Sequence, residues 1–391
     1  MMNKKTVTIL GSTGSIGVQA LEVIEEKPEL FQVGYITANN NIELVAEQIK
    51  KYNPRGVVVR NSESCEKLKS LISFDGMISC GKEALIAVAA DSKNDLVLSS
   101  LVGFSGVEPT MAAIESGIDV ALANKETLVS AGKIITEKAK EENVNIIAVD
   151  SEHSAILQCL AGEEHKEIEK LILTASGGPF LHTPKEKFRE LNVKQALDHP
   201  NWAMGNKITI DSSTLMNKGF EVIEASWLFD IPAERINVVV HPESIIHSMV
   251  QFIDGSVKAQ IGLPSMKIPI AYSLSYPRRL DYSFPRIDMA EIGKLTFFEP
   301  DYDKFPCLRL AFNALEQGGT ATAVLNAANE IAVSAFLQEQ IEYLDIAGCI
   351  DDALNNIEII DCPTLEEIID IDNKTRDHTR KKIKTIMKRK V

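Results

Sequence analysis

The sequence lacks long apolar runs, paired cysteines and an excess of basic residues. No run approaches the roughly 20 apolar residues of a membrane-spanning helix, and the apolar stretch Thr6–Leu10 near the N-terminus is too short for a secretion signal. The six cysteines are scattered without a CxxC pair, which indicates reduced thiols. The net charge of −14 argues against nucleic acid or an anionic membrane as partner. We therefore expect a soluble, cytoplasmic protein that binds any anionic ligand through a local group of donors.

The length of the chain and the order of its apolar segments indicate an α/β protein with several domains. At 391 residues the chain is too long for one ordinary core. Its first 150 residues alternate short β-branched runs with stretches of helical spacing, which is typical of a parallel sheet covered on both faces. The predicted strands are Thr6–Leu10, Gln32–Thr37, Gly56–Val59, Leu96–Ser99, Asp119–Leu122 and Ile146–Val149.

From about residue 151 the pattern predicts an α+β region followed by a helical bundle. Loops rich in glycine, proline and asparagine separate the predicted strands, and long loops are often functional. The expected elements are strands Leu171–Thr174, Ile236–Val240 and Ser256–Ile261, a helix near Thr214–Phe229, and terminal helices Ala323–Gln338, Tyr343–Asn355 and Asn373–Lys390. The basic residues between Arg380 and Lys390 are typical of a solvated helix face. Nucleic-acid binding is the alternative, which the acidic net charge disfavours.

A glycine-rich loop directly follows the first predicted strand. It spans Gly11–Gly17 (GSTGSIG) and leads into an amphipathic helix. Glycines let the backbone approach a pyrophosphate closely, and the helix N-terminus offers N–H groups. The spacing GxxGxxG is weak evidence by itself, but its place in an alternating domain predicts a dinucleotide-binding loop. A tight structural turn is the alternative.

The end of the second predicted strand favours NADPH over NADH. Folds that bind NAD usually place a carboxylate there to hold the ribose hydroxyls. This strand instead runs through Thr37 and Ala38 into Asn39, Asn40 and Asn41. Because small neutral side chains can donate hydrogen bonds to a 2′-phosphate, these three asparagines are candidate cofactor contacts.

Carboxylates at the end of Ile146–Val149 predict a metal site. Asp150, Ser151 and Glu152 follow this strand directly, and ligands bind at the carboxyl ends of parallel strands. Residues i and i+2 of an extended chain point the same way, so Asp150 and Glu152 are expected to converge on one cation. The alternative is a helix N-cap followed by a first-turn acid.

A second polar cluster, in residues 211–221, supports the metal site. Asn217 and Glu221 are four residues apart and share a helix face, with Lys218 beside them. Three carboxylates without His or Cys at ligand spacing suit Mg²⁺ or Mn²⁺ rather than zinc. Lys218, Asn217 and the serine hydroxyls of this segment are candidates to hold a phosphate next to the cation.

Two loops have the features of ligand-binding segments. Thr174–Pro179 offers a hydroxyl and backbone donors where a strand ends. His199–Gly205 carries Trp202, one of only two tryptophans, and is a candidate lid that excludes water. Burial of Trp202 in the core and capping of the next element by His199 are the structural alternatives.

Together these segments resemble one family, the 1-deoxy-D-xylulose 5-phosphate reductoisomerases of the non-mevalonate isoprenoid pathway. The shared motifs occur in the family's order over essentially the whole chain: GSTGSIG (11–17), LANKE (122–126), VDSEH (149–153), SGGPF (176–180), HPNWAMG (199–205), MNKGFE (216–221) and LNAANE (325–330). The resemblance implies a homodimer with four parts in each chain. These are a Rossmann-like NADPH-binding domain at 1–150, a catalytic and dimerisation domain at 151–285, a linker at 286–311 and a C-terminal helical domain at 312–391.

The resemblance also implies roles for individual residues. It places the cation on Asp150, Glu152 and Glu221. The implied substrate contacts are Lys125, Ser151, Glu152, Ser176, His199, Ser212, Asn217, Lys218 and Glu221, with Trp202 and Met204 in the lid. The implied cofactor contacts are Thr13, Gly14, Ser15, Ile16, Asn41, Asn124, Glu126 and Gly205. The chain departs from the family at Asn39, where the family often has glycine.

The implied reaction is a rearrangement followed by a reduction. The cation would chelate the carbonyl and a neighbouring hydroxyl of the sugar phosphate, so that the carbon skeleton breaks and rejoins as a branched aldehyde. NADPH would then reduce this aldehyde to 2-C-methyl-D-erythritol 4-phosphate. Lys218 and Asn217 would fix the phosphate far from the reacting carbon. Lys125 would assist proton movement near the cofactor.

Two other functions fit part of the sequence. An NADPH-dependent dehydrogenase that acts without rearrangement accounts for residues 1–150 but leaves the three carboxylates without a role. A catalytically silent NAD(P)-binding sensor predicts that these carboxylates and Lys218 can be lost without effect. The three carboxylates are the feature that argues against both.

Overall fold

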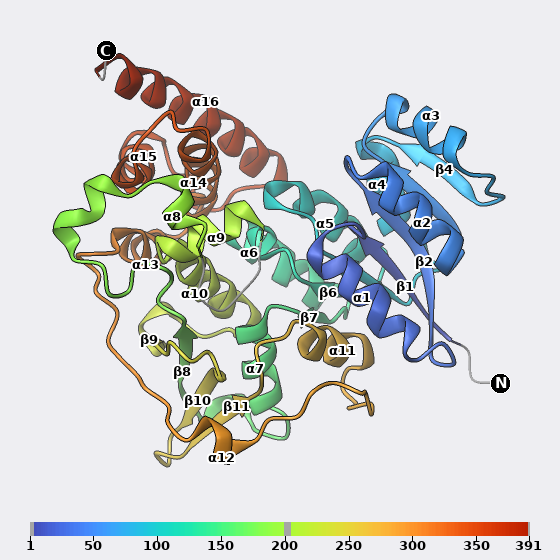
Figure 1. Cartoon of the computed structure of the whole chain (residues 1–391), viewed down its shortest axis with the longest axis horizontal. Helices are drawn as coiled ribbons and strands as arrows, with labels where there is room; N and C mark the ends of the chain where they lie inside the picture. Colours follow the sequence, from blue (N-terminus) through green and yellow to red (C-terminus); the bar gives the residue numbers. More distant parts are fainter. Residues whose placement is uncertain (1–3, 199–204, 390–391) are drawn as a thin grey trace. The chain divides into compact units, whose positions relative to one another are not determined.

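The computed structural model describes residues 4–198 and 205–389 and divides the chain into two compact units (Figure 1). The first unit comprises Met1–Thr127, Ile135–Ser154 and Ser265–Pro285. The second comprises Leu128–Ile134, Ala155–Pro264 and Arg286–Val391. None of the described helices is both long and apolar enough to cross a membrane.

The first unit contains a parallel sheet of seven strands in the order β4-β3-β2-β1-β5-β6-β7. Its strands are β1 (Lys5–Leu10), β2 (Phe31–Ala38), β3 (Gly56–Val59), β4 (Met77–Cys80), β5 (Leu96–Ser99), β6 (Asp119–Leu122) and β7 (Ile146–Ala148). Every residue of β3 and β5 is buried, as expected for strands covered on both faces. The predicted α/β fold class is confirmed. Strand β4 was not predicted, because it is a short edge strand with only one β-branched residue.

Helices connect these strands on both faces of the sheet. They are α1 (Ser15–Glu25), α2 (Ile42–Tyr52), α3 (Ser62–Leu71), α4 (Lys82–Ala89), α5 (Val107–Glu115) and α6 (Lys125–Glu141), and α11 (Lys267–Ser275) lies beside α1 (Figure 1). Parallel connections are right-handed as a rule, so the strand order places α1–α3 on one face and α4 and α5 on the other. The direction of the strand order reverses between β1 and β5. This switch point is where open α/β sheets bind ligands.

The second unit contains a mixed sheet of four strands in the order β11-β10-β8-β9. The strands are β8 (Ile168–Ala175), β9 (Ile236–Val240), β10 (Ile246–Phe252) and β11 (Val257–Ile261). Strands β8 and β9 are parallel, and the other two pairs are antiparallel. The three strands predicted in this region are confirmed. Strand β10 was missed because His, Ser and Gln interrupt its apolar residues.

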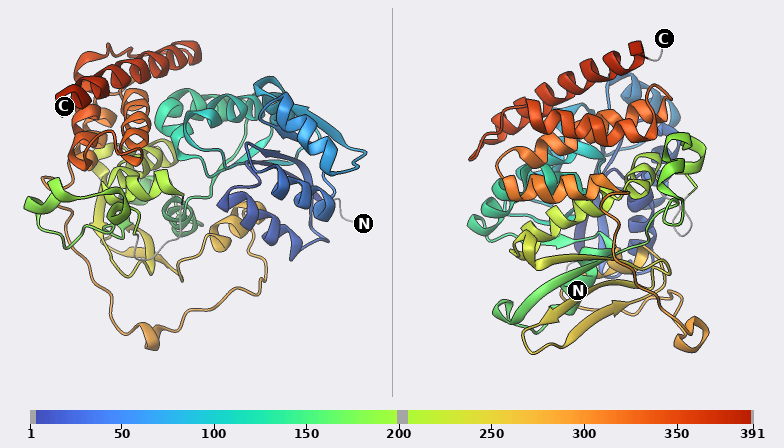
Figure 2. Two further views of the ribbon diagram at one scale, coloured as in Figure 1. Left: turned by 45° about the horizontal axis from the view of Figure 1, so that its top comes forward. Right: turned by 90° about the vertical axis from the view of Figure 1, so that its left-hand side faces the viewer.

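Besides the second sheet, the region after β7 contains helices joined by loops. They are α7 (Ser151–Cys159), α8 (Val193–Ala196), α9 (Asn206–Ser213), α10 (Met216–Phe229), α12 (Met289–Ile292), α13 (Pro306–Gln317), α14 (Ala321–Leu337), α15 (Tyr343–Asn356) and α16 (Leu365–Arg389). Helix α14 contacts α13, α15 and α16, and Figure 2 shows these helices in orange to red. The predicted terminal bundle is thus confirmed, with α13 beginning inside the expected linker 286–311.

One apolar core runs through the second unit. It includes Leu171 and Leu173 of β8, Phe220 of α10, and Val324 and Leu325 of α14. The sheet, α10 and the terminal bundle therefore share buried side chains. A displacement in the bundle can be transmitted to α9 and α10 because interiors are close-packed.

Candidate active site

The glycine-rich loop lies between β1 and α1, at the switch point of the first sheet. Gly14 is the N-cap of α1, and no side-chain hydrogen bond caps this helix among the described residues. The first N–H groups of a helix have no partner within the helix. Together with the helix dipole they suit the negative charge of a phosphate.

Close backbone contacts explain two of the glycines in this loop. A Cβ atom on Gly11, whose φ is +89°, would lie 2.8 Å from the carbonyl oxygen of Ser100. A Cβ atom on Gly17 would lie 2.4 Å from the carbonyl oxygen of Gly11. The Gly11 N–H also donates to the Thr37 hydroxyl at 2.8 Å, which ties the loop to β2. The loop conformation therefore excludes larger side chains at both positions.

The remaining cofactor candidates of this unit lie at the ends of neighbouring strands. Asn39 and Asn40 are exposed after β2, and Asn41 caps α2 by accepting a hydrogen bond from the Leu44 N–H at 3.2 Å. After β6, the buried Asn124 side chain donates to the carbonyl of Leu101, to that of Gly103 and to the Glu126 carboxylate. These contacts hold the segment after β5 against the start of α6.

A buried charged group follows at the ends of β6 and β7. Lys125 Nζ lies 2.9 Å from Asp150 Oδ2, and His153 Nδ1 lies 3.3 Å from the same oxygen. Burial would raise the pKa of Asp150, but the Lys125 ammonium and the His153 ring outweigh it and hold that pKa below its usual range. The Asp150 carboxylate is therefore ionised at neutral pH. An ionised carboxylate is a preferred ligand of Mg²⁺.

The Asp150 and Glu152 carboxylates lie close enough to bind one cation, as predicted, but the extended geometry given as the reason was wrong. Strand β7 ends at Ala148 and α7 begins at Ser151, so residues 150–152 are not an extended strand. The Asp150 carboxylate accepts a hydrogen bond from the Ser151 N–H at 3.1 Å. Glu152 lies in the first turn of α7, where its carboxylate accepts from the Ser151 hydroxyl at 2.6 Å. The alternative of a helix start with a first-turn acid is thus the observed local structure.

In the second unit, a strained turn joins α9 to α10. Ser212 lies in the last turn of α9, and Leu215, which follows this helix, has a φ of +57°. A non-glycine residue in this left-handed region costs roughly 1–3 kcal/mol and is found mainly where the surrounding structure or function requires it. Helix α10 begins at the next residue, Met216, so the turn joins two helices that both carry candidate site residues.

The first turns of α10 contain a buried ion pair. The Asn217 side-chain amide donates to Glu221 Oε1, and the Lys218 ammonium donates to Glu221 Oε2. Lys218 is 3% exposed and Glu221 is 1% exposed. The predicted sharing of one helix face by Asn217 and Glu221 is therefore confirmed. Burial of an ammonium and a carboxylate is costly unless both are paired, so this arrangement is typical of a functional site.

The loop with the Ser176 hydroxyl lies against the end of α9. Gly177 and Gly178 have φ values of +85° and +65°, and a Cβ atom on Gly178 would lie 2.8 Å from the Ser212 carbonyl oxygen. The Ser176 hydroxyl accepts a hydrogen bond from the Gly178 N–H at 3.3 Å. The structure therefore brings together the segments of Ser176 and Ser212, which the sequence placed in the same site.

Part of the predicted lid is not described. His199, Trp202 and Met204 lie outside the described residues. Gly205 is exposed and forms the N-cap of α9.

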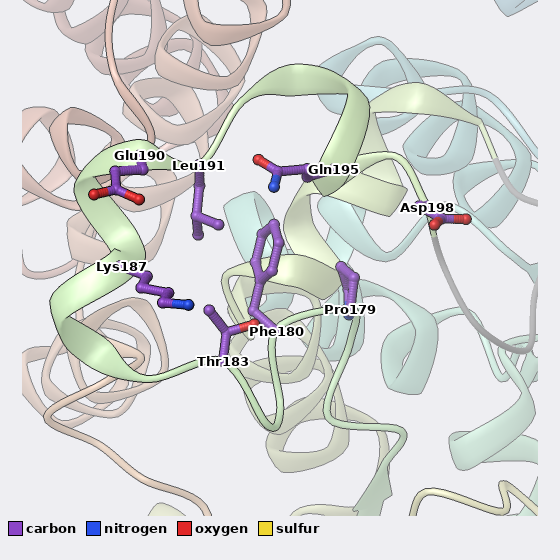
Figure 3. A pocket seen from close by; sticks show the side chains of 8 residues that line it. All are labelled: Pro179, Phe180, Thr183, Lys187, Glu190, Leu191, Gln195 and Asp198. Carbon is purple, nitrogen blue, oxygen red and sulfur yellow. The ribbon is translucent and has the colours of Figure 1, made fainter.

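A pocket of about 420 Å³ lies in the second unit (Figure 3). Its lining combines the Phe180 ring with side chains of both charges: Pro179, Phe180, Thr183, Lys187, Glu190, Leu191, Gln195 and Asp198. Only Pro179 and Phe180 belong to a motif singled out in the sequence. The pocket therefore lies beside the Ser176 loop rather than among the predicted site residues.

Several buried polar residues of these regions were not predicted. His153 belongs to the VDSEH motif, but no role was predicted for it, and it is fully buried against Asp150. Asp211 is 1% exposed and lies between Lys207 and Asn329. The motif that holds Asn329 was visible, but no spacing in the sequence links residue 211 to residue 329.

Three family models match the chain. The model described as 1-deoxy-D-xylulose 5-phosphate reductoisomerase matches residues 7–132, and the C-terminal domain of the same enzyme matches residues 146–229. The model described as DXP reductoisomerase C-terminal domain matches residues 261–378. Together these matches cover most of the chain.

Curated relatives and solved structures give the same picture. The 1-deoxy-D-xylulose 5-phosphate reductoisomerase of Chloroherpeton thalassium is 52% identical over 95% of this chain and 96% of its own length. The 1-deoxy-D-xylulose 5-phosphate reductoisomerase 1 of Bacillus anthracis is 52% identical over 96% of this chain and 97% of its own. The structure of the Zymomonas mobilis enzyme in complex with NADPH is 39% identical, with a TM-score of 0.92 over 97% of this chain and 99% of that chain. The structure of a DOX-P reductoisomerase in complex with NADPH, fosmidomycin and magnesium is 39% identical, with a TM-score of 0.93 over 97% of this chain and 98% of that chain.

Proposed function

The chain belongs to the 1-deoxy-D-xylulose 5-phosphate reductoisomerase family, and we propose how its own side chains carry out the reaction of that family. It is an NADPH-dependent oxidoreductase of isoprenoid precursor biosynthesis. It converts 1-deoxy-D-xylulose 5-phosphate into 2-C-methyl-D-erythritol 4-phosphate with Mg²⁺ or Mn²⁺ as cofactor. A dehydrogenase without rearrangement and a silent sensor do not account for this family membership.

Asp150, Glu152 and Glu221 bind the divalent cation in this proposal. All three offer carboxylate oxygens, which are hard ligands suited to Mg²⁺ and Mn²⁺. The low pKa of Asp150 keeps its carboxylate ionised, and Glu221 is held in place by Asn217 and Lys218. When bound, the cation supplies Lewis-acid polarisation of the substrate's carbonyl and hydroxyl oxygens.

Ser151, Ser176, His199, Ser212, Asn217 and Lys218 bind the substrate, and Trp202 covers it. The buried Lys218 ammonium carries this assignment, because a buried positive charge in the first turn of α10 is suited to an anionic ligand. The contact between the Gly178 backbone and the Ser212 carbonyl places two of the serine-bearing segments side by side. Fixing the phosphate orients the rest of the substrate for the rearrangement.

The first unit carries most of the proposed contacts to NADPH, which supplies the hydride when bound. The N-terminus of α1, with Thr13, Gly14, Ser15 and Ile16, takes the pyrophosphate. Asn39, Asn40 and Asn41 take the 2′-phosphate end. Asn124, Glu126 and Gly205 contact the remainder of the cofactor. Lys125, which is 2.9 Å from Asp150, moves protons beside the reacting carbon.

The domain roles, the homodimer and the cytoplasmic location are also part of the proposal. Residues 1–150 bind NADPH, 151–285 carry catalysis and dimerisation, 286–311 are the linker and 312–391 form the helical domain. Strand β11 supports the dimer, because it ends the second sheet with no strand on its outer side in the described chain, and Val257 and Ile261 are exposed on it. The six free cysteines suit a reducing compartment. Light scattering that gives the mass of a single chain would contradict the dimer.

The metal assignment is tested by Mn²⁺ binding, measured by electron paramagnetic resonance. We expect Asp150→Asn and Glu221→Gln each to weaken Mn²⁺ binding by at least about tenfold, because each removes a charged ligand. Glu316→Gln, an exposed glutamate on α13, is the matched control and should bind Mn²⁺ like the unmodified protein. Unchanged Mn²⁺ affinity in both ligand variants would refute the assignment.

A further inference from the structure

We propose that Asn329 and Tyr343 of the C-terminal helices are positioning residues for the substrate phosphate. This inference rests on the proposed function, in which Ser212, Asn217 and Lys218 bind that phosphate. Neither residue belongs to the proposed binding set. Each reaches the backbone or side chain next to Ser212 through one buried hydrogen bond.

The first hydrogen bond fixes the residue before Ser212. Asn329 Nδ2 donates to Asp211 Oδ1 at 2.8 Å, and Lys207 Nζ lies 2.8 Å from Asp211 Oδ2. Asp211 is 1% exposed and Asn329 is fully buried. Each carboxylate oxygen thus has its own donor, one from α9 and one from α14. A buried carboxylate that loses a donor is strongly destabilised, so the Asp211 side chain has little freedom to move.

The second hydrogen bond fixes the residue after Ser212. The Tyr343 hydroxyl donates to the Ser213 carbonyl oxygen at 2.6 Å. Ser213 is the last residue of α9, and the carbonyl groups at the end of a helix accept no hydrogen bond from within that helix. Burial raises the pKa of Tyr343 far above its usual value, so the hydroxyl remains a donor throughout the range in which an enzyme works.

The Tyr343 ring is itself held by aromatic neighbours. Its centroid lies 5.2 Å from that of Phe180, 5.7 Å from that of Phe188 and 5.8 Å from that of Phe336, all in edge-on arrangements. Phe180 belongs to the SGGPF motif that carries Ser176, and its ring also lines the pocket in Figure 3. One residue of the terminal bundle therefore contacts the Ser176 loop and the end of α9 together.

The hydrogen bonds from Asn329 and Tyr343 hold the phosphate segment, by which we mean residues 211–218, where a small shift changes the proposed binding geometry. Ser212 lies between the anchored residues Asp211 and Ser213, and the strained Leu215 then directs the chain into Asn217 and Lys218. A rotation of the end of α9 would change the separation between the Ser212 hydroxyl and the α10 donors. Misplacement by about 1 Å is enough to reduce catalysis by roughly 100-fold. The bundle thereby sets the geometry of a site to which it contributes no binding group.

The test uses Tyr343→Phe and Asn329→Leu in the full-length enzyme. Each change removes the donor and keeps most of the side-chain volume, and Tyr343→Phe also retains every aromatic contact. We expect the KM for 1-deoxy-D-xylulose 5-phosphate and the inhibition constant of inorganic phosphate each to rise roughly 10-fold or more. The KM for NADPH should stay unchanged. Ile350→Val, in the same bundle and fully buried, is the matched control that lowers stability and leaves all three constants unchanged.

A double-mutant cycle with Ser212→Ala distinguishes the possible failures. If Asn329 acts through the phosphate segment, Asn329→Leu should raise the KM less in the Ser212→Ala background than in the unmodified enzyme. Equal increases in the two backgrounds, or variants that behave like Ile350→Val, would overturn the positioning role alone. If Ser212→Ala itself leaves the KM and the phosphate inhibition unchanged, the proposed phosphate site fails and the positioning role fails with it.

Discussion

The glycine-rich loop of the first unit and the phosphate segment of the second are held in place in different ways. The loop is fixed mainly by close packing against backbone, since a Cβ atom on Gly17 would lie 2.4 Å from the Gly11 carbonyl oxygen and one on Gly11 would lie 2.8 Å from that of Ser100. The segment around Ser212 is fixed by hydrogen bonds from residues 118 and 130 positions away in the sequence. The first site therefore depends on the backbone of the loop and of the strands beside it, whereas the second depends on side-chain hydrogen bonds made by the assembled core.

Removing a large aromatic side chain from the second core should produce the largest effect. Phe188 is 1% exposed and its ring contacts Phe180, Phe305 and Tyr343. We expect Phe188→Ala to lower the free energy of unfolding by about 3–5 kcal/mol and to raise the KM for the sugar phosphate. Urea unfolding and steady-state kinetics measure the two effects. A changed affinity for NADPH with an unchanged substrate KM would break the contrast between the two sites.

A single methyl group in the glycine-rich loop should have a smaller effect confined to the cofactor. Gly17→Ala forces a Cβ atom against backbone, and such overpacking costs about 1–3 kcal/mol. If this cost falls on the bound loop, the affinity for NADPH drops by roughly 10- to 100-fold. Fluorescence titration with NADPH measures the loss.

Gly348→Ala is the matched control for that loop variant. A Cβ atom on Gly348, inside α15, meets no atom within 4 Å, so NADPH affinity should not change. Equal affinities of Gly17→Ala and the unmodified protein would show that the loop is not closely fitted to the cofactor.

The smallest effect concerns an ion pair on the surface of the bundle. Burial would raise the pKa of Asp352, but hydrogen bonds from Lys382 and His378 outweigh it and hold that pKa below its usual value. A lowered folded-state pKa stabilises the protein above the unfolded value of about 3.9, and this stability is lost as the pH falls through the folded pKa. We expect Asp352→Asn to lower the free energy of unfolding at pH 7 by about 0.2–1 kcal/mol, the range of partly exposed pairs.

Urea unfolding at two pH values checks the sign of that effect. The difference between Asp352→Asn and the unmodified protein should shrink from pH 7 to pH 3, because the carboxylate becomes protonated. The activity should not change at pH 7, because the Asp352 carboxylate is only partly buried and pairs with His378 and Lys382 of α16 rather than with a proposed site residue. A difference that grows on acidification would contradict the direction of the pKa shift.

The sequence predicted the first unit well because its signals are local. Apolar runs of strand length, a glycine loop after the first of them and polar residues at strand ends all lie within short windows. The strands Gly56–Val59, Leu96–Ser99 and Asp119–Leu122 were predicted to the residue. The edge strand β4 was not predicted, because a short, half-exposed strand has no clear apolar period.

The second site could be predicted only in part. Asn217, Lys218 and Glu221 share a helix turn, so their spacing revealed their contact. The arrangement of Asp211 was hidden, since its donor Asn329 comes from a helix that meets α9 only after the core has formed. The pairing of Asp150 with Glu152 was argued from extended geometry, yet a helix begins between them at Ser151. The Asp211–Asn329 contact, by contrast, joins residues 118 positions apart and forms only on folding, so it leaves no periodic signal in the sequence.

The most direct test of the account is NADPH oxidation by the purified enzyme with 1-deoxy-D-xylulose 5-phosphate and Mn²⁺. We expect NADPH oxidation to stop when excess chelator is added. Glu221→Gln should lower the rate of oxidation by roughly 100-fold or more, because the cation supplies several kcal/mol of transition-state stabilisation. The variant should still bind NADPH, because Glu221 is not among the proposed cofactor contacts. Glu221→Gln with nearly full metal-dependent activity would contradict the assignment of Asp150, Glu152 and Glu221 as the catalytic metal site.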